Sequence, residues 1–210
     1  MKQMTTEPHN TIKPYEVVKV PDPVLKQVAH EIQTIDDAIK VQVERMITSM
    51  YADKGIGLAA NQVGILNRIF VMDVPKDCWR FGQEIDGVLT IDAGYRSGER
   101  DEDTPPAQNP IVMINPEIVW LSDQRSVYEE GCLSIPKQYA DVIRPASVRV
   151  EYLDVSGQKQ EGLFEGLDGH CVQHELDHLN GILFVDHISS LKRNMIMKRM
   201  KKLQKDSQAL

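Results

Sequence analysis

The stretch that decides the fold is QHELDHLNG, residues 173–181. It places His174 and His178 four residues apart, with Glu175 directly after the first histidine. Residues four apart lie on one face of an α-helix, one turn from each other, so both imidazoles can reach a single metal ion. Glu175 then lies near enough to accept a proton from a water molecule at that ion. We therefore expect a helix that carries two ligands of a metal site.

The residues around the motif indicate whether these histidines are buried. A surface helix with two solvated histidines is the alternative to a metal site. The neighbours are mostly apolar, namely Val172, Leu176, Leu179, Ile182, Leu183 and Phe184. Because buried polar groups need partners, two neutral histidines on one buried face favour a shared metal ion.

A catalytic site of this kind has three protein ligands and one open position, so a third ligand is required. Downstream candidates are Asp186 and His187, eight and nine residues after the second histidine. Upstream, the segment EEGCLSIP contains Cys132 directly after a glycine that permits a bend, and a metal-bound cysteine is a thiolate. Taken alone, Cys132 is also typical of a small buried hydrophobic residue. Cys171, three residues before His174 on the predicted helix, is a second contender for the third ligand, but its neighbours favour a place in the core or in a pocket.

The composition is that of an ordinary globular protein, with 210 residues, 41% hydrophobic and 26% charged. This length suits a single domain over residues 1–210. A net charge of −7 and a pI near 5.4 argue against a DNA-binding protein, which needs a basic surface. The three cysteines are odd in number and widely spaced, which argues against a disulfide framework.

The N-terminal residues 1–16 form a polar tail that lacks the apolar core of a signal peptide. No apolar run in the sequence approaches the roughly 20 residues that a membrane helix needs. We therefore expect a cytoplasmic protein that does not bind membranes.

Hydrophobic patterns predict the elements around the motif. Apolar residues recur at helical spacing from 36 to 53. Apolar and β-branched runs predict strands at 68–74, 111–120 and 126–130, and a hairpin of residues 147–154 and 159–166. Residues 76–110 lose the pattern and are predicted to be an insertion that is partly loop. Within it, residues 97–110 are too polar and too rich in proline to be buried.

A last helix is predicted over residues 187–205. Its apolar residues form a rough stripe, namely Ile188, Leu191, Met195, Ile196, Met200 and Leu203. Its basic residues form another face, namely Lys192, Arg193, Lys198, Arg199, Lys201, Lys202 and Lys205. A solvated surface is the ordinary explanation of such a run of charge.

Three segments, GIGLAANQ (55–62), EGCLS (130–134) and QHELDH (173–178), together and in this order resemble the signature motifs of peptide deformylases. The resemblance implies an α+β fold, with antiparallel β-sheets packed around a central helix that carries HExxH, and a C-terminal helix. It also implies that Cys132 completes the metal site with His174 and His178. The implied cofactor is one divalent ion per chain, with Fe2+ expected and Zn2+ or Ni2+ able to replace it.

The same resemblance implies a reaction. The expected activity is removal of the formyl group from formyl-Met N-termini of nascent peptides, which releases formate. Metal-bound hydroxide would attack, with Glu175 as general acid and base. The side-chain amide of Gln62 and the backbone N–H of Leu133 would stabilise the developing negative charge.

Substrate contacts are expected around the first and second motifs. Gly57 would let the peptide backbone approach closely, because it has no side chain. Candidates for a pocket that takes the methionine side chain are Ile56, Leu133, Leu167 and Cys171, for which core packing is an equal alternative.

One residue departs from the pattern of the family. Tyr139 stands where many members of the family carry an arginine near the substrate channel.

By the resemblance, the basic C-terminal helix would dock on ribosomal RNA near the nascent chain. A metallopeptidase that cuts internal bonds and a non-catalytic, metal-stabilised module at the ribosome are the competing functions.

Overall fold

The computed structural model describes residues 12–75, 78–93 and 109–208. Most of the predicted tail at 1–16 and most of the polar segment at 97–110 therefore lie outside the described residues. Three short 3-10 helices join the larger elements: η1 (Pro23–Lys26), η2 (Ala60–Val63) and η3 (Phe184–Asp186).

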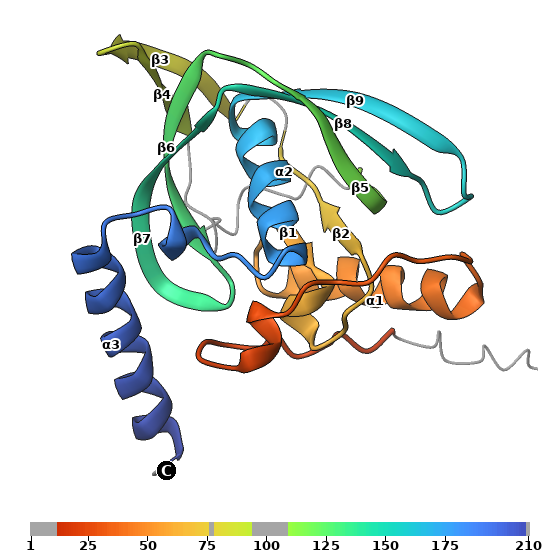
Figure 1. Cartoon of the computed structure of the whole chain (residues 1–210). Helices are drawn as coiled ribbons and strands as arrows, with labels where there is room; N and C mark the ends of the chain where they lie inside the picture. The colour runs from red at the N-terminus through yellow and green to blue at the C-terminus, as the bar shows by residue number, and fades with distance from the viewer. Residues whose placement is uncertain (1–11, 76–77, 94–108, 209–210) are drawn as a thin grey trace, which may run out of the picture.

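The strands form two sheets (Figure 1). The five-stranded sheet is antiparallel, in the order β1 (Gly57–Ala59), β2 (Ile69–Met72), β5 (Ile111–Leu121), β8 (Ser147–Leu153) and β9 (Lys159–Glu165). The four-stranded sheet has the order β3 (Trp79–Ile85), β4 (Val88–Ala93), β6 (Arg125–Cys132) and β7 (Ile135–Pro145). The predicted strands and the 147–166 hairpin are confirmed as β2, β5, β6, β8 and β9. The expected α+β fold with β-sheets around a central helix is confirmed, and within it one pair of strands, β4 and β6, runs parallel.

The predicted insertion at 76–110 is more regular than its pattern indicates. Residues 79–93 form the β3–β4 hairpin, which extends the four-stranded sheet. Its turn is built by Asp86 and Gly87, with φ angles of 51° and 80°. Because both faces of the hairpin are largely exposed or half-buried, the sequence lacks the alternation that marks a strand over a core. The Asp-Gly pair is the signal that indicates this turn.

Helix α2 (Gly166–Leu179) lies between the two sheets (Figure 1) and contacts strands of both. Nearly all of its residues are buried, which confirms the central helix expected from the HExxH motif. The helix begins at Gly166, whose φ of 52° is left-handed. A side chain at this glycine would collide with the indole of Trp79, since its Cβ would lie 2.0 Å from Cζ3. The β3–β4 hairpin therefore packs directly on the first turn of α2.

Helix α1 (Asp37–Ala52) confirms the helix predicted at 36–53. The Asp36 side chain caps it by accepting a hydrogen bond from the backbone N–H of Ile39 at 3.0 Å. The buried face of α1, with Val43, Met46 and Met50, packs in a core cluster beside β1 and β2. The first motif, at β1 and η2, thus packs beside α1.

Helix α3 (Ser190–Gln208) is the predicted C-terminal helix. Within the predicted apolar stripe, Ile196 and Met200 are buried, whereas Leu191, Met195 and Leu203 are 71%, 51% and 49% exposed. Only part of the predicted rough stripe is therefore buried, because the helix touches the protein along a narrow contact and projects away from it (Figure 1). No helix among the described residues is long and apolar enough to cross a membrane.

Candidate metal centre

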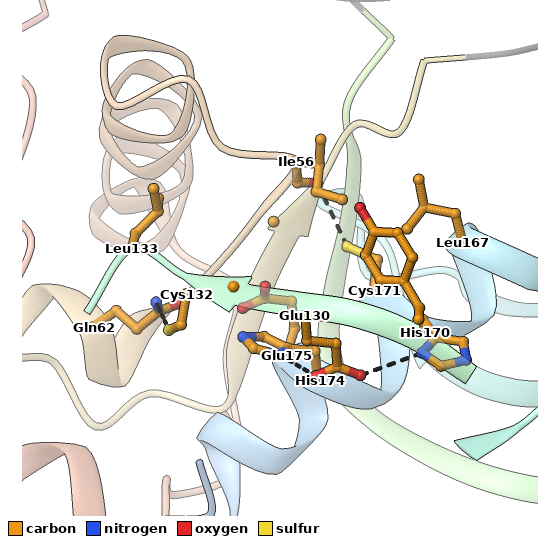
Figure 2. A pocket seen from close by; sticks show the side chains of 13 residues that line it. Ile56, Gln62, Glu130, Cys132, Leu133, Leu167, His170, Cys171, His174 and Glu175 are labelled. Atoms are coloured by element: carbon orange, nitrogen blue, oxygen red, sulfur yellow. Dashed lines mark hydrogen bonds and ion pairs between the residues drawn. The ribbon is translucent and has the colours of Figure 1, made fainter. Parts of the chain in front are cut away.

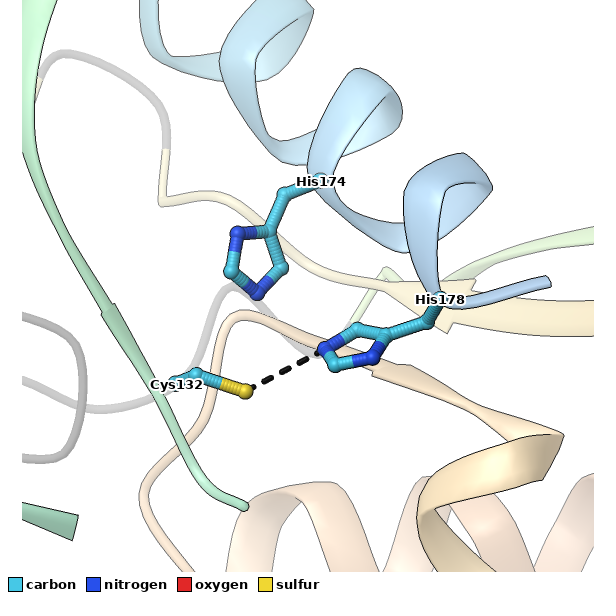
Figure 3. Close-up of side chains that lie close together, drawn as sticks. All are labelled: Cys132, His174 and His178. Atoms are coloured by element: carbon cyan, nitrogen blue, oxygen red, sulfur yellow. Dashed lines mark hydrogen bonds between the residues drawn. The ribbon is translucent and has the colours of Figure 1, made fainter. Parts of the chain in front are cut away.

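Cys132, His174 and His178 meet in the structure (Figure 3). Cys132 is the last residue of β6, and the two histidines lie one turn apart on α2. One ligand atom from each lies within 4.8 Å of the others, and Cys132 Sγ is 3.2 Å from His178 Nε2. A tetrahedral ion with ligand bonds of about 2.0–2.3 Å keeps its ligand atoms roughly 3.5 Å apart, so the donor set fits a divalent ion.

The bend expected before Cys132 is a break in the pairing of β6 with β7 between Gly131 and Cys132. Gly131 is required here because a Cβ would lie 2.6 Å from the ring of Tyr139, which pairs with it across the strands. The break turns the thiol of Cys132 towards α2, where the histidines are.

The two buried thiols near the site differ in protonation. Burial opposes ionisation of Cys132, but His178 and His174 outweigh it and hold the pKa of this thiol well below its usual value. Burial raises the pKa of the Cys171 thiol well above the usual value, and Glu175 adds to the effect. Cys132 is therefore the thiolate, the form that binds metal ions, whereas Cys171 stays protonated.

The first histidine is oriented by a carboxylate that our sequence reasoning missed as a functional residue. His174 Nδ1 lies 2.9 Å from Glu130 Oε2. Since a carboxylate only accepts hydrogen bonds, His174 donates from Nδ1 and keeps Nε2 for an ion. Arg144 holds Glu130 through Nε at 2.5 Å and Nη2 at 3.0 Å. Despite complete burial, Arg144 and the two neighbouring histidines keep the pKa of Glu130 well below its usual value.

The ion-pair network continues to the surface. Arg144 Nη1 lies 2.8 Å from Asp177 Oδ2, which is 2.7 Å from His187 Nε2. Asp186 pairs with Lys26. The two downstream candidates for the third ligand therefore have other partners, and neither belongs to the metal cluster.

Glu175 is buried beside the ligands, and its Oε2 has no hydrogen-bond partner among the described residues. Burial raises the pKa of its carboxyl to about 7, against the opposing effect of the two histidines. Gly57 makes room for this carboxylate, because a Cβ there would lie 2.3 Å from Glu175 Oε1. An unpaired buried carboxylate oxygen points to a partner that the protein itself does not supply, such as a water molecule.

Gln62 reaches the site from η2. Its Oε1 accepts a hydrogen bond from the backbone N–H of Ala59 at 2.8 Å, which fixes the orientation of the amide. The amide nitrogen therefore faces the site, 3.5 Å from Cys132 Sγ and 3.4 Å from Ser134 Oγ. The side chain presents an N–H donor next to the thiolate.

A pocket opens beside the cluster (Figure 2). Its lining brings together every residue that the sequence suggested for substrate contact, namely Ile56, Gly57, Leu133, Leu167 and Cys171, and also includes Gln62. Tyr128, Glu130, Gly131, Cys132, His170, His174 and Glu175 complete it. The pocket thus joins an apolar end to the thiolate, the imidazoles and the free carboxylate, an arrangement suited to metal-assisted hydrolysis of a substrate with an apolar side chain.

The chain is similar to known proteins in sequence and in fold. The family model described as polypeptide deformylase matches residues 14–194. A peptide deformylase of Mesorhizobium japonicum is 47% identical over 93% of this chain and 94% of its own length. One of Novosphingobium aromaticivorans is 45% identical over 90% of this chain and 97% of its own.

A crystal structure of peptide deformylase from Ehrlichia chaffeensis superposes with a TM-score of 0.76 at 33% identity, and covers 93% of this chain and 99% of that one. A second structure from this organism, in complex with actinonin, gives a TM-score of 0.74 at 34% identity and covers 90% of this chain and 97% of that chain. The chain therefore belongs to the peptide deformylase family, whose members are metal-dependent hydrolases.

Proposed function

We propose that this protein removes the formyl group from formyl-methionyl N-termini of nascent polypeptides and releases formate. The observation that carries the proposal is the meeting of one thiolate, two imidazoles and an unpaired carboxylate oxygen at the end of a pocket. The family match supports the same reaction. We also propose that the chain forms a single catalytic domain and that the protein acts in the cytoplasm.

Cys132, His174 and His178 would hold one divalent ion, with Fe2+ as the working metal and Zn2+ or Ni2+ as substitutes. Their mixed sulfur and nitrogen donors admit all three ions. When bound, the ion supplies Lewis acidity and lowers the pKa of a water molecule towards neutrality.

Glu175 would move the proton in this reaction. As a carboxylate, its free Oε2 accepts a proton from water during attack on the formyl carbon. It then delivers the proton to the amine nitrogen that leaves. A carboxyl with a pKa near 7 suits both steps, because it can hold and release a proton near neutral pH.

Gln62 and the backbone N–H of Leu133 would stabilise the negative charge that grows on the formyl oxygen. The fixed orientation of Gln62 means that its N–H group needs no reorganisation during the reaction. Leu133 follows the Cys132 ligand directly and also lines the pocket.

The methionine side chain would occupy the apolar part of the pocket, against Ile56, Leu133, Leu167 and Cys171. Gly57 would leave the peptide backbone free to approach, in addition to making room for Glu175. We further propose that the exposed basic residues of α3 dock on ribosomal RNA, where the nascent chain emerges.

The test is formate release from formyl-Met-Ala-Ser by protein purified without oxygen and loaded with Fe2+. The matched control peptide is acetyl-Met-Ala-Ser, which differs only in the blocking group. We expect formate from the first peptide, an intact second peptide, and loss of activity in air. Cleavage of internal bonds in both peptides would instead identify a metallopeptidase. Bound metal without any turnover would identify a non-catalytic module.

A further inference from the structure

Helix α2 contains a third buried histidine, His170, that is not part of the metal cluster. His170 is 1% exposed, and both of its ring nitrogens have protein partners. Nδ1 lies 3.2 Å from Glu130 Oε1, and Nε2 lies 3.0 Å from Ser126 Oγ on β6. Figure 2 shows Glu130 between His170 on one side and His174 on the other. The four residues form one chain of hydrogen bonds from β6 to a metal ligand.

The direction of these hydrogen bonds follows from the chemistry of the groups. Glu130 is ionised beside Arg144 and can only accept. His170 therefore donates its Nδ1–H to Glu130, and in the neutral imidazole Nε2 is then the acceptor. The hydroxyl of Ser126 donates to Nε2 and so keeps His170 in this tautomer.

Each oxygen of Glu130 receives two donors. Oε1 accepts from Arg144 Nε and His170 Nδ1, and Oε2 accepts from Arg144 Nη2 and His174 Nδ1. Arg144 holds the carboxylate along one edge, whereas the two histidines hold it from α2. Without His170, Oε1 loses the donor that opposes the pull of Arg144, and the carboxylate can turn away from His174.

We infer that His170 is a positioning residue for the metal site: with Ser126 it fixes the carboxylate of Glu130, and through it the tautomer and ring plane of His174. The inference rests on the proposed metal site. It predicts that His170 affects how tightly the protein retains a divalent ion, although it is not a ligand itself. Partners in the shell behind the ligands typically change metal affinity by about 10- to 100-fold.

Three variants separate the hydrogen bond from the bulk of the ring. His170→Leu keeps an apolar side chain of similar size but has no donor. His170→Asn carries an amide N–H that can take the place of Nδ1–H. Ser126→Ala removes only the group that fixes the tautomer and leaves the pocket wall intact. The control is Val172→Ala, a buried truncation on the same helix with no polar contact.

The measurement is the dissociation constant of Zn2+, obtained by competition between the loaded protein and a chromophoric chelator. The visible spectrum of the Co2+-loaded protein adds a readout of ligand geometry. We expect His170→Leu to weaken Zn2+ binding about 10-fold and to alter the Co2+ spectrum, and His170→Asn to stay within about 3-fold of wild type. Ser126→Ala should lose about 3-fold, and Val172→Ala should bind as wild type does.

Wild-type Zn2+ affinity and an unchanged Co2+ spectrum in His170→Leu would overturn the inference, as would a His170→Asn protein as weak as His170→Leu. If His170→Leu does not fold, wild-type affinity in Ser126→Ala overturns it. Because the readout is metal binding, a protein that binds Zn2+ as expected but releases no formate when loaded with Fe2+ would disprove the proposed activity and leave the role of His170 standing. A wild-type protein that binds no Zn2+ would disprove both.

Discussion

Glu175 illustrates how neighbouring residues set the chemistry of one side chain. Gly57 leaves the space that the carboxylate of Glu175 occupies. The protonated thiol of Cys171 also lies next to Gly57. Burial raises the pKa of Glu175 to about 7, and its Oε2 stays without a partner among the described residues. Glu175 is held next to the proposed metal ligands and forms no ion pair within the part of the chain that the structure describes.

We expect Glu175→Gln to retain metal and lose at least about 100-fold in kcat, because the amide preserves the shape of the side chain but cannot take a proton. The measurements are formate release and metal content of the purified variant. Near wild-type deformylation with full metal content would contradict the role of Glu175 as the proton carrier.

At this scale the sequence predicts the residues that belong to contiguous motifs. His174, His178 and Glu175 follow from helical spacing, while Cys132 and Gln62 follow from the resemblance of three motifs. The network around Glu130 and Arg144 does not follow, because each of its contacts joins segments that are distant in the chain. The one hint is that Arg144 lies in a strand whose other inward residues are mostly apolar.

At the scale of elements, the contact between β3 and α2 supports the helix that bears both histidines. Trp79 packs on Gly166 and donates a hydrogen bond from Nε1 to Asp168 Oδ2 at 2.9 Å. The indole therefore holds the first turn of α2 at two points, the backbone at Gly166 and the side chain of Asp168. The β3–β4 hairpin acts as a brace for the metal site.

We expect Gly166→Ala to destabilise the protein more than Gly87→Ala. Both glycines have positive φ, so each substitution introduces backbone strain of about 1 kcal/mol or more. A Cβ at Gly87 meets open space, whereas at Gly166 it collides with Trp79, which adds roughly 1–3 kcal/mol. Urea unfolding of both variants measures the difference. Equal losses of unfolding free energy in the two variants would show that Trp79 does not pack tightly against α2.

Asp186 joins three elements near the start of α3. It pairs with Lys26 of η1, accepts a hydrogen bond from the backbone N–H of Leu183 at 2.9 Å, and lies 3.3 Å from Arg193 of α3. Burial opposes its ionisation, but these partners hold the pKa of the carboxyl below its usual value. Its charge thus contributes stability above the pKa of the unfolded chain, and this contribution is lost as the pH falls through the folded pKa.

We expect Asp186→Asn to be less stable than wild type at pH 7, by roughly 1 kcal/mol or less since the group is partly solvated. The gap should begin to shrink below about pH 4, the pKa of an aspartate in the unfolded chain, and shrink further as the pH falls through the lower pKa of the folded protein. Urea midpoints of both proteins from pH 3 to pH 7 measure it. A gap that stays constant over this range would mean that charge is not the cause.

Elements differ in how far the sequence predicts them. Helix α1 and the β8–β9 hairpin have strong periodicity, because each buries one face, and they are found where predicted. Strand β7 was not predicted, although its residues alternate between buried and exposed in the structure. The buried positions of β7 include the small Ala140 and the polar Gln138 and Arg144. Hydrophobicity alone therefore does not show which of its residues face the core.

At the scale of the whole molecule, α3 stands apart from the two sheets (Figure 1). Its buried residues Ile196 and Met200 pack in the same apolar cluster as Cys132. Removing the helix would therefore uncover the side of the core that supports the metal ligand. Exposed charges on the helix can be changed without this effect.

We expect a variant with Lys198→Gln, Lys202→Gln and Lys205→Gln to bind purified ribosomes more weakly than wild type, with a smaller dependence on salt. Its turnover of a short formyl peptide should be unchanged, since these side chains are exposed. The control carries the same change in charge elsewhere, at the exposed Lys13, Lys40 and Lys159. Co-sedimentation measures binding. Equal binding by wild type and both variants would disprove docking through α3.

Two distant segments, the end of β6 and helix α2, bring one sulfur and two nitrogen ligands to the same proposed ion site. X-ray absorption at the metal edge of the Zn2+-loaded protein tests this arrangement most directly. We expect one sulfur at about 2.3 Å and two imidazole nitrogens at about 2.0–2.1 Å, with the sulfur lost in Cys132→Ser and kept in Cys171→Ser. A metal shell without sulfur, or one that keeps its sulfur in Cys132→Ser, would contradict the account.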